Sequence, residues 1–296
     1  MNVNFVAFTD ESYITAERFR SIASYSMPFN ILETVEIELN SILVSSNVRE
    51  FKWEKLKDAR YRFCAIKIID YIIDSIINNN IRIDIVIWDT YDSRHCVRNR
   101  NDDANFERMF FHLLTSSMKR RPHLSKWGIY PDEKNEIDWN TIKSCLKAVG
   151  QWRDNKASIF AIDFFSDQFF HIEELQQVIS KERPPSQVAD LFAGLGVFSK
   201  THYSKYKNWL LSQSLNFGLF DQDQVEEKLS NREKARFEVL RYFNEKCKLL
   251  KLGVSLESKC CLNTPNPKNP INFWTYVPQH EFDKAPTKII NTFLEI

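Results

Sequence analysis

A segment near the N-terminus, from Val3 to Asp10, carries apolar side chains on both faces of an extended chain. Val6 and Phe8 point to one face, and Phe5 and Ala7 point to the other. Strands that are apolar on both faces are typical of the interior of a sheet that helices cover on both sides. The segment therefore predicts a central strand, and its last residue is an acid at the point where the chain turns.

Strand and helix patterns alternate after this segment up to residue 198. The clearest further strand runs from Ile81 to Trp88, where isoleucines alternate with Arg82 and Asp84. Other strands are expected at residues 18–26, 126–130 and 158–162, and helices are expected to begin near residues 30, 56, 106, 139 and 187. This alternation predicts an α/β fold.

The character of the chain changes near residue 201. A charged stretch with a helical pattern covers residues 222–251, and a tail rich in proline and asparagine begins at residue 263. We therefore expect an α/β domain over residues 1–200 and a mainly helical C-terminal extension over residues 201–296. The extension would act as a cap or as a surface for a partner protein or a second copy in a homo-oligomer.

Composition limits the classes of function. Lys and Arg total 40 and Asp and Glu total 39, so the net charge of +1 gives no overall attraction to nucleic acid or membrane. The 6 glycines include no phosphate-binding loop. The N-terminus lacks a signal-peptide pattern, the isoleucine-rich stretch at residues 64–77 is interrupted by charges, and the cysteines lack zinc-site spacing. We expect a soluble, cytoplasmic protein without membrane contact.

Four acids stand at the boundaries of predicted elements or inside a helix. Asp10 ends the first strand, Glu50 precedes a helix, and Asp132 follows a strand. Asp190 lies in an apolar helical segment, residues 187–194, that contains several small residues. Each acid also has a structural explanation: a turn for Asp10, the helix dipole for Glu50, a solvated loop for Asp132 and a helix-packing salt bridge for Asp190.

Taken together, the acids suit a metal centre. A buried carboxylate without a partner is costly, so Asp190 is expected to meet a cation. Mg²⁺ takes oxygen ligands, and two such ions about 4 Å apart can activate water and stabilise a leaving oxygen. The inventory predicts a carboxylate site for Mg²⁺ or Mn²⁺ that hydrolyses phosphodiester bonds.

The order of these motifs resembles the family catalogued as domain of unknown function 3800, over about residues 3–198. The resemblance implies an RNase H-like fold, with a mixed sheet flanked by helices, and a metal-dependent nuclease that acts on DNA or RNA. One departure is Tyr13, which stands where the family commonly has glycine. The matching motifs are Asp-Glu-Ser at 10–12, Glu50 with Lys52, Asp-Glu at 132–133 and Gln-Val-Ala-Asp-Leu at 187–191.

The resemblance also implies a role for each motif residue. Asp10 would bridge two metal ions, Glu50 and Asp132 would each hold one, and Asp190 would complete the second site. Lys52 would contact a phosphate or orient the attacking water. Glu11 would be a reserve ligand.

Two other polar segments compete with this assignment. Asp89 follows the strand at residues 81–88 and could replace Asp132 as a ligand, and His95 could then act as a general base. The simpler interpretation is a polar loop. The basic run at residues 119–121 could contact backbone phosphates, or it could favour the C-terminal end of the helix before it.

Three functions remain open from the sequence. The leading hypothesis is a nuclease, and the alternative from another class is a non-catalytic interaction or regulatory module on the same fold. A phosphoesterase that acts on nucleotides is the third. Convergence of the four acids would favour an enzyme, and a closed pocket in place of an open basic groove would favour the phosphoesterase.

Overall fold

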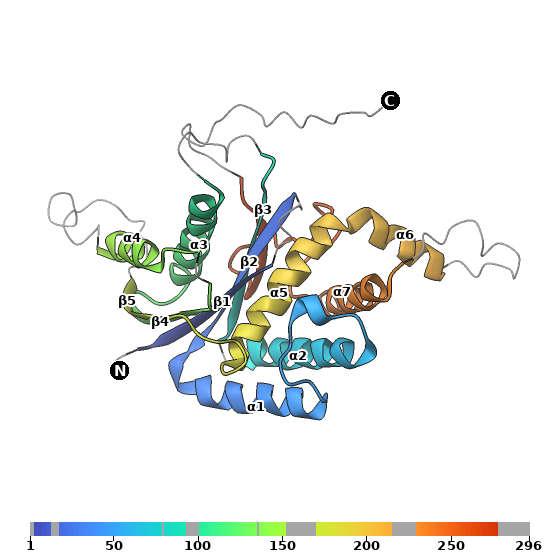
Figure 1. Cartoon of the computed structure of the whole chain (residues 1–296), viewed down its shortest axis with the longest axis horizontal. Coiled ribbons are helices and arrows are strands. Elements are labelled where there is room, and N and C mark those ends of the chain that lie inside the picture. Colours follow the sequence, from blue (N-terminus) through green and yellow to red (C-terminus); the bar gives the residue numbers. More distant parts are fainter. Residues whose placement is uncertain are drawn as a thin grey trace, which may run out of the picture.

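The computed structural model describes residues 3–12, 18–78, 80–92, 101–134, 136–151, 170–214 and 229–277. Its centre is a six-stranded mixed sheet in the order β5-β4-β1-β2-β3-β6 (Figure 1). Strand β2 is antiparallel to β1 and β3, and the other neighbours are parallel. The strands are β1 (Phe5–Ser12), β2 (Phe19–Pro28), β3 (Arg82–Asp89), β4 (Ser125–Pro131), β5 (Phe170–Leu175) and β6 (Ile271–Thr275).

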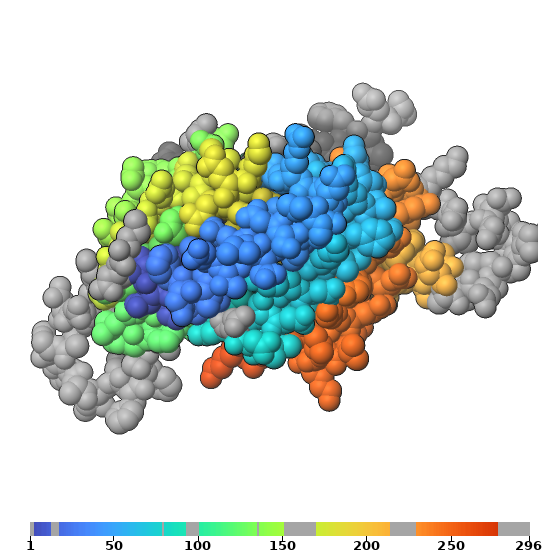
Figure 2. All heavy atoms as spheres, turned by 90° about the horizontal axis from the view of Figure 1, so that it is seen from below, coloured from blue at the N-terminus to red at the C-terminus, as the bar shows by residue number. Residues whose placement is uncertain are grey.

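Helices cover both faces of the sheet. The elements are α1 (Leu32–Ser45), α2 (Ala59–Asn78), α3 (Asp102–Met118), α4 (Trp139–Gln151), α5 (Pro184–Thr201), α6 (Tyr203–Ser214) and α7 (Asn231–Leu249), with short 3₁₀ turns η1 (Phe29–Ile31) and η2 (Trp53–Lys55). Helices α3 and α4 pack on one face, and α1, α2, α5 and α7 pack on the other. Figure 2 shows α1, α2 and α7 lying side by side over the second face.

The alternation in β1 explains the two layers. Val6 and Phe8 belong to the hydrophobic core on the α5 side, whereas Phe5 and Ala7 belong to the core on the α3 side. All four side chains are at most 8% exposed, so β1 is buried on both faces. The predicted central strand and the α/β class are therefore confirmed.

Helix α5 crosses the centre of the sheet, and small residues let it come close to its neighbours. The Ser21 hydroxyl on β2 donates a hydrogen bond of 2.6 Å to the Ala193 carbonyl. A Cβ atom placed on Gly194 would lie 2.2 Å from Cγ of Trp53, which is itself buried. The close approach expected from the small residues of this helix thus fixes the segment that carries Trp53.

Replacing Gly194 by alanine should therefore destabilise the protein by about 1–3 kcal/mol or more, because the buried Trp53 ring must move. Gly196→Ala is the matched control in the same helix, and it should destabilise the protein less. Its Cβ would lie 3.0 Å from Cγ2 of Ile85, a milder overlap than at Gly194, and helix propensity favours alanine. Urea unfolding of both variants measures the difference. Equal midpoints would contradict the proposed packing of α5 on Trp53.

Several elements differ from the sequence-based expectations. The long helix expected to open near residue 56 begins at Ala59, because Asp58 Oδ1 accepts a hydrogen bond from the Tyr61 amide and so caps it. Strand β5 was not predicted, and the strand expected at residues 158–162 lies outside the described residues.

The C-terminal region is helical in α6 and α7, as expected, and it also supplies β6. Strand β6 pairs with β3, and α7 packs against α2. Residues after 201 therefore share the sheet and its core, and the domain boundary at residue 200 stays a prediction. Within the described ranges, no helix has both the length and the apolar composition that a membrane span requires.

Candidate functional site

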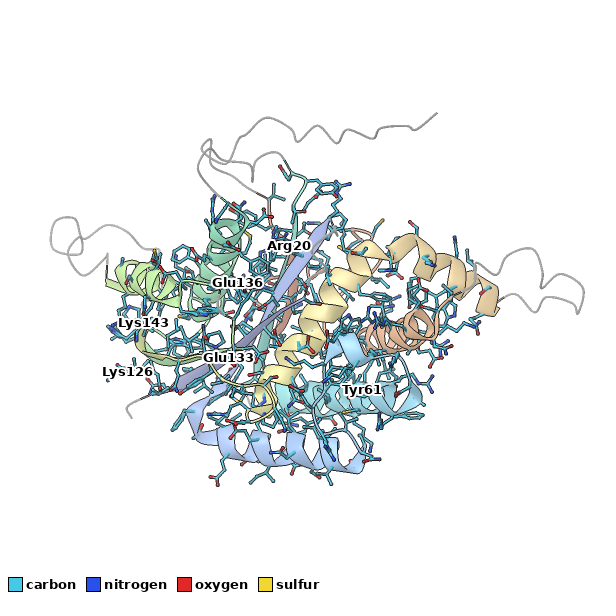
Figure 3. All side chains as sticks on the ribbon, in the orientation of Figure 1. Arg20, Tyr61, Lys126, Glu133, Glu136 and Lys143 are labelled. Atoms are coloured by element: carbon cyan, nitrogen blue, oxygen red, sulfur yellow. The ribbon has the colours of Figure 1, made fainter. Side chains whose placement is uncertain are left out.

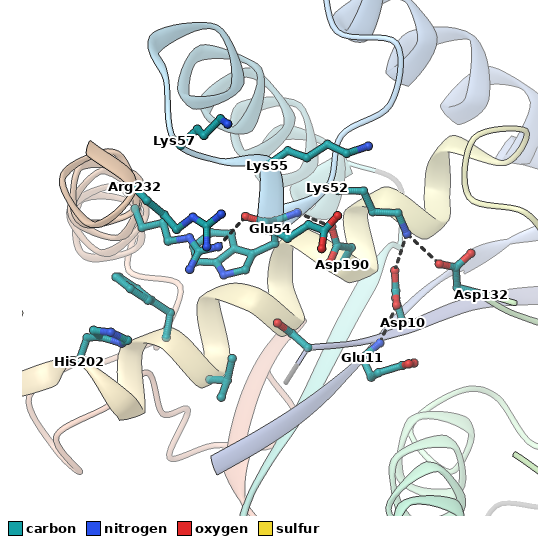
Figure 4. A pocket seen from close by; sticks show the side chains of 15 residues that line it. Asp10, Glu11, Lys52, Glu54, Lys55, Lys57, Asp132, Asp190, His202 and Arg232 are labelled. Atoms are coloured by element: carbon teal, nitrogen blue, oxygen red, sulfur yellow. Dashed lines mark hydrogen bonds and ion pairs between the residues drawn. The ribbon is translucent and has the colours of Figure 1, made fainter. Parts of the chain in front are cut away.

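A pocket of about 700 Å³ opens beside the ends of β1 and β4 (Figure 4). Because these strands are parallel neighbours, their carboxyl ends meet at one edge of the sheet, where ligands commonly bind in α/β proteins. Asp10 lies near the carboxyl end of β1, which runs on to Ser12, Asp132 follows β4, and Asp190 reaches the same pocket from α5. The structure thus brings together three of the four predicted acids.

Lys52 lies among these acids. Its ammonium nitrogen is 2.8 Å from Oδ2 of Asp132 and 3.6 Å from Oδ2 of Asp10. Burial alone would lower the pKa of Lys52, but the charge of Asp10 and the hydrogen bond to Asp132 outweigh it and raise this pKa above its ordinary value. Lys52 is therefore held as a cation between two carboxylates.

One ammonium group does not balance the negative charge. Burial is the largest cause that raises the pKa of Asp10 well above its ordinary value, and the charges of Asp190 and Glu11 add to it. Burial likewise raises the pKa of Asp190 to about 7, against the lowering effect of Lys52 and with a further rise from Asp132. The cluster therefore favours any additional cation.

Asp10 has an oxygen that is available for a ligand. Its Oδ1 accepts a hydrogen bond of 2.8 Å from the Glu11 amide. Its Oδ2 is buried and accepts no hydrogen bond from the described part of the chain. The ammonium of Lys52 lies 3.6 Å from Oδ2, beyond hydrogen-bond distance, so this buried oxygen favours a closer donor or cation.

The acids do not form a ready-made metal cage. Among the described residues, no group of three His, Cys, Asp or Glu side chains stands at metal-binding distances. The ammonium of Lys52 lies between Asp10 and Asp132, and Asp190 Oδ2 accepts a hydrogen bond of 2.6 Å from the Trp53 amide. A metal ion would therefore have to compete with Lys52 for the two strand-end carboxylates.

Glu50 does not line the pocket. One of its oxygens accepts a hydrogen bond of 2.8 Å from the Ser180 hydroxyl, and the other accepts one of 3.3 Å from Lys55. Burial tends to raise the pKa of Glu50, but the Ser180 hydrogen bond and the charge of Lys52 outweigh it, so the pKa is lowered. Glu50 is therefore a carboxylate with partners of its own.

Two residues whose roles the sequence did not indicate hold these acids in place. The Ser180 amide donates a hydrogen bond of 3.1 Å to Asp132, so Ser180 joins Asp132 to Glu50. Buried Gln187 donates to the Ser180 carbonyl at 2.8 Å and accepts from the Phe51 amide at 2.7 Å. Gln187 belongs to the motif at 187–191, but nothing in the sequence around Ser180 signals its role.

The two reserve ligands, Glu11 and Asp89, lie in different surroundings. Glu11 lines the pocket, but it forms an ion pair of 2.6 Å with Lys134. Asp89 lies outside the pocket, where Arg18 binds both of its oxygens at 2.9 Å or less. His95 lies outside the described residues.

The basic run at residues 119–121 is held on the other face of the sheet. Arg120 donates to buried Asp84 at 3.2 Å, and Arg121 donates to the Ser26 carbonyl at 3.0 Å. Asp84 also accepts a hydrogen bond from Ser117 of α3, which places this network on the α3 side. Arg120 and Arg121 therefore join strands to α3, whereas the sequence left them open as phosphate contacts.

Two proteins from Methanothermobacter thermautotrophicus match this chain over nearly its whole length. The one described as uncharacterized protein ORF2' is 37% identical over 292 residues, which are 96% of this chain and 98% of the relative. The one described as uncharacterized protein ORF2 is 35% identical with the same coverage. The chain belongs to this ORF2 family. The similarity to these two proteins covers both the α/β core and the C-terminal region.

No family model and no solved structure matches this ORF2 family member. The resemblance to the domain of unknown function 3800 therefore stays a prediction that rests on the motifs quoted above. Neither relative's name states an activity. The function of the ORF2 family has to be argued from the pocket.

Proposed function

We propose that this protein is a Mg²⁺- or Mn²⁺-dependent nuclease. The observation that carries the proposal is the convergence of Asp10, Asp132 and Asp190 around one cation, at the carboxyl ends of adjacent parallel strands. The mixed sheet with helices on both faces is consistent with the RNase H-like fold that the sequence motifs imply. Carboxylates in such a place are the ligands that Mg²⁺ prefers.

The residues present fit a divalent ion. Asp10 offers a buried oxygen without a hydrogen-bond donor, and burial, with a smaller contribution from the charge of Asp132, raises the pKa of Asp190. Asp10 and Asp132 would hold the ion, with Asp190 and Glu50 close by. A bound ion would supply an activated water and would stabilise the leaving oxygen of a phosphodiester.

Without a metal ion, Lys52 neutralises part of the negative charge of this site. Its ammonium sits on a flexible four-carbon stem, so it can leave the carboxylates when a divalent ion competes for them. Once released, it can pair with a phosphate of the substrate. Lys52 would therefore form ion pairs with the acids in the free protein and with a substrate phosphate in the complex.

Cleavage assays with single- and double-stranded DNA and RNA test the proposal, each with Mg²⁺, Mn²⁺ or EDTA. We expect cleavage only with a divalent ion, and cleavage that survives EDTA would reject the mechanism. Hydrolysis of nucleotides alone would favour the phosphoesterase hypothesis. Thermal unfolding gives a second readout, because an ion at 100 times its Kd should stabilise the fold by about 2.7 kcal/mol.

The ion pairs of Lys52 favour one alternative, a non-catalytic interaction module. In that case Lys52 would neutralise Asp10 and Asp132 permanently, as a structural salt bridge. The unfolding temperature distinguishes the two functions. A module without a metal site would show the same temperature with Mn²⁺ and with EDTA.

A further inference from the structure

The pocket has a second wall with the opposite charge. Lys55 belongs to η2, Lys57 follows it, and Arg232 and Arg236 come from α7. Figure 4 shows Lys57 and Arg232 at the side of the pocket away from Asp132. Two segments that are far apart in the sequence thus place four cations beside the carboxylates.

Packing fixes this basic wall in position. Arg236 donates a hydrogen bond of 2.9 Å to the Trp53 carbonyl, and its guanidinium lies 4.9 Å from the centre of the Trp53 ring. The Trp53 amide in turn holds Asp190. Helix α7, η2 and the acidic cluster are therefore parts of one rigid arrangement.

The charges of the two walls do not neutralise one another. Lys57 and Arg232 are exposed, and within the described ranges neither makes an ion pair or a side-chain hydrogen bond. Lys55 pairs with Glu50 at 3.3 Å, and Glu54 is the acid on the same segment. Free positive charge therefore faces the pocket on one side, and excess negative charge faces it on the other.

A suitable ligand would bind the carboxylates through a metal ion and would present an anionic group to the basic wall of the pocket. A strand of nucleic acid has this character, because it repeats one phosphate per nucleotide. A pocket of about 700 Å³ admits a unit of nucleotide size. The His202 ring lines the same pocket, stacked on Phe198 with centroids 4.4 Å apart, and it offers a surface for an unpaired base.

We propose that Lys57 and Arg232, together with Lys55, form a second phosphate subsite for a single strand of nucleic acid. It holds the phosphate next to the one that lies at Asp10 and Asp132. The inference rests on the proposed function, because it places the scissile phosphate at the carboxylates. It assigns the direction in which the strand leaves them, along η2 and the start of α7.

Binding of labelled oligonucleotides to the full chain tests the subsite. All proteins carry Asp10→Asn, so that cleavage does not interfere, and fluorescence anisotropy is measured with single-stranded DNA, single-stranded RNA and duplex. The test variant adds Lys57→Gln and Arg232→Gln. The control adds Lys119→Gln at the C-terminal end of α3 and Lys143→Gln in α4, and Figure 3 shows Lys143 far from α7.

We expect the test variant to bind single strands roughly tenfold more weakly than the control variant. Its salt dependence should also fall, by about 0.7 in the slope of log affinity against log salt for each lost phosphate contact. A dinucleotide should compete better than a mononucleotide. Equal affinity in the test and control variants, stronger binding of duplex, or no binding by any of the proteins would overturn the subsite.

Cleavage by chains that keep Asp10 separates this inference from the proposed function. If single strands bind through Lys57 and Arg232 but no divalent ion supports cleavage, the nuclease proposal fails and the subsite stands. If cleavage at low substrate concentration is unchanged by Lys57→Gln and Arg232→Gln, the subsite fails and the nuclease proposal stands.

Discussion

Replacing Asp10 by asparagine is expected to reduce the proposed metal-dependent cleavage at least about 100-fold, because the charge stabilisation that a metal ion would provide is worth several kcal/mol and each 1.36 kcal/mol is tenfold in rate. Asp10 carries the buried oxygen that lacks a donor, and it also faces Lys52. The amide is nearly isosteric with the carboxylate but lacks its charge. Initial cleavage rates at saturating Mn²⁺ measure the effect.

The fold should survive this change. The pKa of Asp10 is raised by burial and by neighbouring acids, so removing its charge relieves repulsion and should not lower the free energy of unfolding. Asp74→Asn on the exposed face of α2 is the matched control, and it should keep full activity. A folded Asp10→Asn protein that cleaves at the normal rate would remove Asp10 from the site.

The second large effect is on the pH dependence of stability. Burial raises the pKa of Asp190 to about 7 in the folded chain, whereas an unfolded aspartate titrates near about 3.9. A carboxyl with a raised folded pKa contributes its stability fully below the unfolded value. That contribution is lost as the pH rises through about 7.

Between pH 4 and pH 7.5 we therefore expect Asp190→Asn to gain stability relative to the unchanged protein. The upper bound is roughly 4 kcal/mol, from about three pKa units at 1.36 kcal/mol each. The asparagine oxygen can still accept the Trp53 hydrogen bond, so the comparison isolates the charge. The substitution also removes the repulsion between Asp190 and Asp10, and this too should raise the stability of the variant.

Urea unfolding of both proteins at each pH measures this difference. Groups with lowered pKa values, such as Glu233, titrate in both proteins and cancel in the comparison. Saturating Mg²⁺ should flatten the curve of the unchanged protein, because a bound ion favours the charged carboxylates. If the two proteins show parallel curves of stability against pH without metal, the pKa of Asp190 is not raised in the folded chain.

The parts of the fold that the sequence predicted are those with strong local patterns. Strands β1 and β3 and helices α1 to α5 carry clear apolar periodicity. Strand β6 lies in a segment rich in proline and asparagine, and it is extended because it pairs with β3. Its Asn272 donates a hydrogen bond of 2.9 Å to buried Asp84, a contact across 188 residues that no local pattern reveals.

The candidate site divides in the same way. Asp10, Asp132 and Asp190 stand out locally, because each is an acid at the end of a strand or inside an apolar helix. Their proximity follows from the parallel pairing of β1 and β4 with α5 above them. The contributions of Ser180 and Arg232 depend on contacts between distant segments, so the sequence could not indicate them.

The late position of β6 and α7 along the chain bears on how the protein forms during synthesis. The edge of β3 is covered only once residues 271–275 are available, and the Trp53 carbonyl meets Arg236 only after α7 has been made. A nascent chain that has folded its first 201 residues would expose an open strand edge, which favours pairing with other chains. During synthesis, the carboxylates of the site would therefore come together before the residues of α7 complete the basic wall of the pocket.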